Sequence, residues 1–181
     1  NQLRQKSPAS VEGVVPELLN LGDVQNVLRN LLRERIPIRD LSGILEVLAN
    51  HAHVTRDTNI LAEAVRQTMS MTISNQYRDE SNTIHVFTLS PMLENTLRGA
   101  LVNSDGGPGL QIEAGLAQRI LTKTGEQMEL LAQAGYLPIL LCPRELRLAF
   151  RRLVEQSLSS LIVLAFSEIG SGTKVKAHGM V

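Results

Sequence analysis

The sequence predicts an α+β protein: an N-terminal all-helical subdomain of helix–turn–helix character, then a small α/β subdomain with a mixed sheet and packed helices. Up to about residue 80, apolar residues recur at helical spacing between short polar connections. Beyond residue 82, β-branched and apolar runs alternate with helical patterns, as expected when helices cover a sheet. We therefore expect two domains, over residues 1–80 and 81–181.

Four helices are expected in the first subdomain. Ser7-Pro8 marks the start of the first, because serine caps helices and proline suits their first turn. Asp23 is expected to cap the second, whose apolar side chains share one face. The apolar positions of this second helix are Val24, Val27, Leu28, Leu31 and Leu32. Apolar spacing predicts the third over Asp40–Ala52 and the fourth over Asn59–Gln76.

The second subdomain is expected to start after a charged turn at residues 78–82 and to follow the order β-α-α-β-α-β-β. Its expected elements are a strand over Ile84–Leu89, a helix from Ser90-Pro91, a helix over Glu113–Ala134, a strand over Leu137–Leu141, a helix over 143–158, a strand over Leu161–Ala165 and an edge strand over Lys174–Ala177. The Gly- and Pro-rich stretch Asn103–Gly109 is predicted to be a flexible loop.

Composition and charge exclude several classes of protein. The 18 basic and 18 acidic residues give a net charge of zero, whereas nucleic-acid and anionic-membrane surfaces need a basic excess. The single cysteine, Cys142, excludes an intrachain disulfide and makes a reducing cytosol the default compartment. No apolar run approaches the roughly 20 residues that span a bilayer.

Catalytic and metal chemistry are weakly supported. Cys142 lies where a strand turns into a helix, a position that can lower a thiol pKa, which makes a Cys-dependent hydrolase one alternative. Nothing marks His85 or His178 as its base, and a structural thiol is the favoured interpretation. His51 and His53 point in different directions on a helix and lack further ligands. We expect no catalytic residue, no metal and no cofactor.

Two clusters of arginine are candidate contacts with other proteins. The first, in the helical subdomain, comprises Arg29, Arg33, Arg35 and Arg39 with Glu34 and Asp40 beside them. In the second, the spacing of Arg144, Arg147 and Arg151 places three guanidinium groups along one helical face. Solvated local ion pairs would explain both clusters. The sharper hypothesis is contact with an acidic neighbour, because arginine forms specific bidentate pairs.

A DNA-binding regulator is the other alternative, since residues 23–52 could form a helix–turn–helix. Its recognition helix would be Asp40–Ala52, which contains Asp40 and Glu46 and no Lys or Arg. Recognition helices are normally basic, so no nucleic-acid partner is expected.

Long stretches of the chain resemble the export-gate family that flagella share with virulence type III secretion systems. The resemblance lies in Val15–Glu34, Ile38-Arg39-Asp40-Leu41, Ile44-Leu45-Glu46, Ala64-Val65-Arg66-Gln67, Leu137–Cys142, Leu148–Glu155 and Val175–Val181. It covers about residues 14–181, and Leu21–Gln25 with Tyr77–Glu80 favours the flagellar branch. Glu34–Pro37 departs from the family pattern and puts only the local turn shape in doubt.

The resemblance implies that the chain is the third (helical) and fourth (α/β) cytoplasmic subdomain of an inner-membrane protein. The fragment would be soluble at the cytoplasmic face, and the membrane would be reached only through a missing N-terminal half. The implied partners are neighbouring copies in a nine-membered ring and other export-apparatus components. Substrate–chaperone complexes would dock mainly on absent subdomains. The function expected is therefore a ring-forming and docking module of a bacterial protein-export gate.

Overall fold

The computed structural model describes residues 19–181. It divides into two compact units, of which one ends at Met69 and the other begins at Ser70. The helix expected from Ser7 lies outside the described residues. The other expected elements fall within them, and the α+β class is confirmed.

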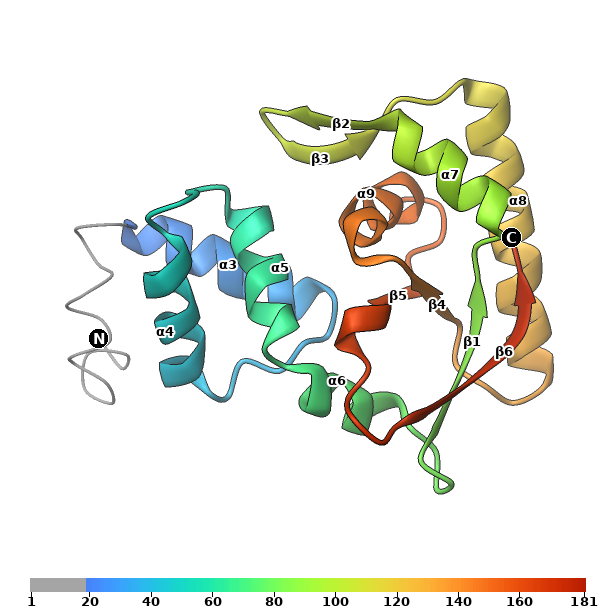
Figure 1. Cartoon of the computed structure of the whole chain (residues 1–181), viewed down its shortest axis with the longest axis horizontal. Helices are drawn as coiled ribbons and strands as arrows, with labels where there is room; N and C mark the ends of the chain where they lie inside the picture. The colour runs from blue at the N-terminus through green and yellow to red at the C-terminus, as the bar shows by residue number, and fades with distance from the viewer. Residues whose placement is uncertain (1–18) are drawn as a thin grey trace. The chain divides into compact units, whose positions relative to one another are not determined.

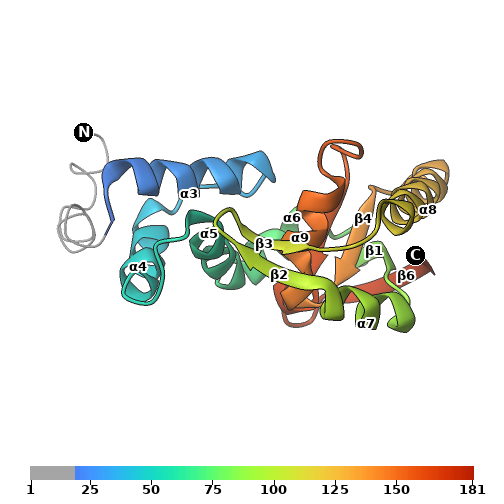
Figure 2. The same ribbon diagram turned by 90° about the horizontal axis from the view of Figure 1, so that it is seen from above.

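From residue 19 onward, the first unit contains three helices, α3 (Leu21–Arg33), α4 (Leu41–His51) and α5 (Thr58–Gln67). Helix α5 packs against both α3 and α4, and Figure 2 shows α3 running across the other two. Their predicted apolar faces form the interior, in which the buried side chains include Val24, Val27, Leu31, Ile44, Leu45, Leu48, Leu61 and Val65. Most positions predicted from helical spacing are buried, but Leu32, which was expected on the apolar face of α3, is 53% exposed, so the prediction was wrong for this residue.

Both ends of α3 are fixed by local hydrogen bonds. The side chain of Asn20 accepts from the amide of Asp23 at 2.8 Å, and Asp23 accepts from the amide of Asn20 at 3.2 Å. This capping box starts α3 before Asp23, so the prediction that Asp23 itself is the cap was wrong. At the other end, the amides of Arg35 and Ile36 donate to the carbonyls of Leu32 and Leu31, which requires φ +62° at Arg35.

The predicted fourth helix is two helices. Helix α5 ends at Gln67, where the hydroxyl of Thr68 donates to the carbonyl of Val65 at 2.7 Å, and α6 (Ser70–Tyr77) starts a new segment. Helix α6 packs against the short 3-10 helix η1 (Phe166–Glu168) of the second unit. There the hydroxyl of Ser74 accepts from the amide of Gly170 at 2.6 Å. The division between units thus lies before α6, whereas the sequence placed it at the charged turn that follows α6.

A four-stranded sheet forms the centre of the second unit (Figure 1). Its strands are β1 (Thr83–Thr88), β4 (Ile139–Cys142), β5 (Ile162–Ala165) and β6 (Lys174–Met180). They lie in the order β5-β4-β1-β6, and all three neighbouring pairs are parallel. Strand β6 is an edge strand, as expected from its alternating sequence.

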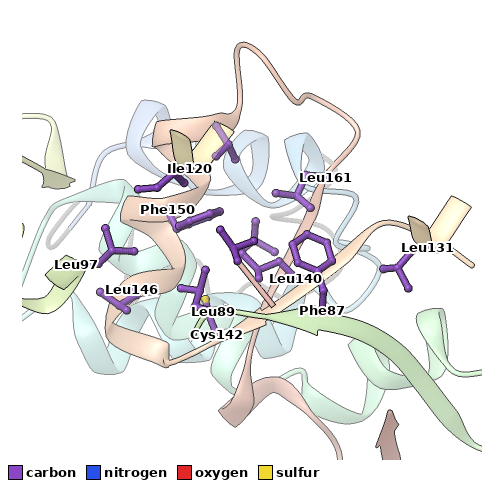
Figure 3. Close-up of a cluster of buried hydrophobic side chains, with 13 residues drawn as sticks. Phe87, Leu89, Leu97, Ile120, Leu131, Leu140, Cys142, Leu146, Phe150 and Leu161 are labelled. Carbon is purple, nitrogen blue, oxygen red and sulfur yellow. The ribbon is translucent and has the colours of Figure 1, made fainter. Parts of the chain in front are cut away.

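Three helices cover one face of this sheet: α7 (Pro91–Ala100), α8 (Ala114–Gln133) and α9 (Arg144–Val154). Phe87 of β1 and Leu140 of β4 pair in register and point into a cluster with Leu97, Ile120 and Phe150 from the helices (Figure 3). Aliphatic side chains fill most of this core, in agreement with the low aromatic content of the sequence.

The expected flexible loop at residues 103–109 is an ordered hairpin, which corrects the prediction. Strands β2 (Leu101–Ser104) and β3 (Gly107–Leu110) pair antiparallel. Gly107 has φ +94°, so the turn at Asp105-Gly106 closes with a residue in a conformation that glycine adopts without strain. Arg152 donates to the carbonyl of Pro108 at 3.0 Å and ties the hairpin to α9. Parallel and antiparallel pairings therefore occupy two separate sheets.

Candidate protein-interaction surfaces

One face of α3 combines exposed leucines with arginines. Leu21 and Leu32 are 55% and 53% exposed, and with exposed Gln25, Arg29 and Arg33 they form what we call the α3 surface. The opposite face of the helix carries the buried residues of the unit. Apolar contact area flanked by arginine is typical of protein interfaces. Arginine is enriched at interfaces, and an exposed apolar patch is often a site where another protein binds.

Three of the other four residues predicted for contact in this unit have intrachain roles. Glu34 forms an ion pair of 3.7 Å with Arg66, whose side chain is 3% exposed. The carboxylate of Asp40 caps α4 by accepting from the amide of Gly43 at 3.0 Å. Arg35 forms the C-terminal turn of α3, and Arg39 precedes α4 on the surface. Arg29 and Arg33 are thus the predicted contact residues that α3 itself presents.

The predicted arginine stripe of the second unit does not face solvent. Arg147 is 0% and Arg151 8% exposed, and only Arg144 is on the surface. Arg147 donates to the carbonyl of Val163 at 3.1 Å, and Arg151 donates to that of Leu161 at 2.8 Å. Their assignment as partner contacts is corrected, because both guanidinium groups are used inside the unit.

These bonds protect the outer edge of β5. An edge strand leaves alternate amides and carbonyls without a neighbour. The two arginines take the carbonyls of Leu161 and Val163, while Glu168 accepts from the amide of Ala165 at 2.8 Å. Spacing alone did not signal this role, because two arginines four residues apart share one helical face whether that face meets solvent or the sheet.

Cys142 is sealed in the core. It ends β4, is 0% exposed and belongs to the cluster beneath α9. A thiol nucleophile needs access for its substrate and a positioned base. The structure therefore gives the hydrolase alternative no usable nucleophile at this position.

The structure brings together four side chains that sequence reasoning left apart. Nδ1 of His85, on β1, lies 2.8 Å from Nε2 of His178, on β6. Nε2 of His85 lies 2.8 Å from a carboxylate oxygen of Asp79. The ring of Tyr136 stacks on His85 with 3.9 Å between ring centroids. We call these residues the histidine cluster. The sequence did not reveal this cluster because β1 and β6, which are neighbours in the sheet, lie at opposite ends of the second unit in the sequence.

The charges of the histidine cluster follow from these contacts. The hydrogen bond from His85, followed by the one from the amide of Thr83, lowers the pKa of Asp79. Burial lowers the pKa of His178, and the nearby His85 and Lys176 add to this effect. At neutral pH, Asp79 is therefore an anion that accepts from His85, and His178 is neutral.

Within residues 19–181, no three or more His, Cys, Asp or Glu side chains gather in a group suited to a metal ion. None of the helices in the same part of the chain has the length and apolar character required to cross a membrane.

Comparison with known structures defines the class of protein. The fold matches the Chlamydia pneumoniae CdsV protein with a TM-score of 0.89 at 27% identity, over 99% of this chain and 51% of that one. It also matches the nonameric EPEC SctV-C with a TM-score of 0.85 at 25% identity, over 99% of this chain and 54% of that one. The chain thus shares the fold of these two proteins.

The family follows from the sequence. The FHIPEP family model matches residues 1–174, and the chain belongs to this family. Its relatives include the flagellar biosynthesis protein FlhA of Escherichia coli, 35% identical over 97% of this chain and 25% of the relative. FlhA of Bacillus subtilis is 30% identical over 100% of this chain and 27% of the relative. The chain spans about a quarter of these relatives, and their names support the flagellar branch.

Proposed function

We propose that this chain is a ring-building module in the cytoplasmic part of a flagellar protein-export gate, and that copies associate through the α3 surface. Family membership supports the export role, and the match to a nonameric relative supports assembly into a ring. The observation that carries the proposal is that α3 exposes two leucines, Leu21 and Leu32, on the same face as Arg29 and Arg33.

Weak individual contacts suit this role. An exposed ion pair contributes about 0–1 kcal/mol, and burying one leucine side chain contributes roughly 1.5–3 kcal/mol. A single contact between copies would therefore be weak, and a closed ring would gain stability because the same contact repeats around it. The isolated chain should be a monomer or weak oligomer in dilute solution.

Docking of other export components is the second part of the proposal. The chain matches the complex of the Chlamydia pneumoniae CdsV and CdsO proteins with a TM-score of 0.86 over 99% of its length. That likeness supports binding of an export-apparatus component to this region. We expect substrate–chaperone complexes to dock mainly on the first and second cytoplasmic subdomains, and the inner membrane to be reached through a separate N-terminal half.

A secretion assay tests the proposal. In the full-length protein, Leu32→Glu places a carboxylate in the α3 surface and should reduce export of flagellar proteins into the medium. Val54→Glu is the matched control, because Val54 is 85% exposed in the same unit and lies outside the α3 surface. Both variants should accumulate to wild-type levels. Normal export by Leu32→Glu, or an equal defect in Val54→Glu, would contradict the assignment.

A further inference from the structure

We propose that His85 and His178 form a binding site for a divalent transition-metal ion such as Zn²⁺, with Asp79 orienting the first imidazole. This site is independent of the α3 surface. It lies between β1 and β6, where the pairing of His85 with Lys176 brings two adjacent backbones into register. The two imidazoles are the ligands, and water would complete the coordination of the ion.

The distance between the two ring nitrogens fits an inserted ion. They are 2.8 Å apart. Two nitrogen ligands about 2.0–2.1 Å from a tetrahedral zinc ion are about 3.3 Å from each other. A shift of about 0.5 Å by the exposed side chain of His178 would therefore convert the hydrogen bond between the imidazoles into a pair of metal–ligand bonds.

The tautomer of His85 is already the one that a metal requires. An ionised Asp79 can only accept, so the Nε2–H of His85 donates to it and Nδ1 keeps its lone pair towards His178. A carboxylate that accepts from the outer nitrogen of a ligating histidine is the usual support of such sites. Without metal, the Nε2–H of His178 donates to His85; with metal, that proton resides on Nδ1 of His178.

Asp79 and the ring of His85 are both held in place. The second carboxylate oxygen of Asp79 accepts from the amides of Ser81 and Thr83 at 2.8 and 3.0 Å. Tyr136 stacks on His85 with a 9° angle between the ring planes.

The chemistry of the donors selects the class of ion. Neutral imidazole nitrogens prefer Zn²⁺, Cu²⁺ and Ni²⁺, whereas Mg²⁺ and Ca²⁺ require oxygen ligands. The side chain of His85 is 13% exposed and that of Asp79 41%, and His178 is exposed on an edge strand. An ion can therefore reach the site from solvent without unfolding the sheet. Once bound, it would join the C-terminal strand β6 to β1.

Titration of the untagged chain with ZnCl₂ by isothermal titration calorimetry tests the proposal. We expect one ion per chain for the wild type, and loss of this binding in both His85→Ala and His178→Ala. His53→Ala is the control, because this histidine belongs to the first unit. Asp79→Asn should keep the stoichiometry and weaken affinity about tenfold to a hundredfold. Lys176→Gln should strengthen binding, because it removes a positive charge near His178.

A second readout separates metal binding from damage to the fold. Zn²⁺ should raise the melting temperature of the wild type by mass action, while in metal-free buffer the circular dichroism of each variant should match that of the wild type. For the His178→Ala variant, the melting temperature should not respond to Zn²⁺. Absence of Zn²⁺ binding by the wild type would overturn the proposal, and so would binding that persists in both folded histidine variants.

Discussion

Nη1 of Arg147 donates to the carbonyl oxygen of Val163 at 3.1 Å, although the arginine is 0% and the valine 2% exposed. The guanidinium group of Arg147 thus supplies a hydrogen-bond donor to a backbone carbonyl on the outer edge of β5, inside the second unit. The same helix presents Arg144 to solvent. Charge on one helix therefore has two different uses, which measurements of stability can distinguish.

Replacing Arg147 by methionine should destabilise the second unit by roughly 1–3 kcal/mol, because the buried carbonyl of Val163 loses its donor. Arg144→Met, at an exposed position of the same helix, should change the stability by less than about 0.5 kcal/mol. Urea unfolding followed by tyrosine fluorescence measures this, since Tyr77 and Tyr136 both belong to the second unit. Equal effects of the two substitutions would mean that Arg147 has no structural role.

Gly170 should not tolerate a side chain. A Cβ at this position would lie 2.6 Å from the sulfur of Met71 and 3.2 Å from the hydroxyl of Ser74. Gly170→Ala would push α6 from η1, and we expect a loss of about 1–3 kcal/mol in the stability of the second unit. Gly99→Ala is the control, because nothing lies within 4 Å of its added Cβ. Alanine favours the helix there, so this variant should be neutral or slightly more stable.

The ion pair between Arg98 and Glu145 should make stability depend on acid. The hydrogen bond from Nε of Arg98, at 2.8 Å, lowers the pKa of Glu145 from its ordinary value. When the pKa of a carboxyl group is lower in the folded than in the unfolded protein, the group stabilises the fold at pH values above its unfolded-state pKa. This stabilisation is lost as the pH falls through the folded-state pKa. Both side chains are substantially exposed, 41% and 50%, so the contribution at pH 7 should be about 0.2–1 kcal/mol.

Urea unfolding of Glu145→Gln measures that contribution. The variant should be less stable than the wild type at pH 7 and equal to it near pH 3. Glu126→Gln, at an exposed position of α8, should show no such dependence on pH. If the difference between Glu145→Gln and the wild type persisted unchanged at pH 3, the ion pair would not be its cause.

Cys142 should react slowly with thiol reagents in the native protein. The side chain is 0% exposed beneath α9, and buried structural cysteines are inert. Reaction with Ellman's reagent should be slow in buffer and immediate in 6 M guanidinium chloride. Rapid native labelling with an acidic apparent pKa would instead favour the hydrolase alternative.

Periodic patterns predicted most of the fold, because burial imposes them directly on the sequence. The stripe Val24-Val27-Leu31 and the apolar run at residues 139–142 marked α3 and β4 in this way. The β2–β3 hairpin escaped prediction since Gly107-Pro108-Gly109 has poor strand propensity, and the hydrogen bond from Arg152 to Pro108 joins residues far apart in the sequence.

The candidate sites were less predictable for a related reason. An arginine stripe has the same spacing whether it faces solvent or, like Arg147, an edge carbonyl. The contact of His85 with His178 depends on which strands are neighbours, and local sequence does not specify this. Features that depend on local sequence, such as helices and buried strands, could therefore be predicted. Contacts that depend on which distant segments are neighbours required the structure.

Sedimentation velocity over a range of protein concentrations tests the central claim, association through the α3 surface, most directly. We expect a monomer at micromolar concentration and reversible growth beyond dimers as the concentration rises. Leu32→Glu should abolish this growth, and Val54→Glu should leave it unchanged. A tight closed dimer, or association that Leu32→Glu leaves intact, would contradict it.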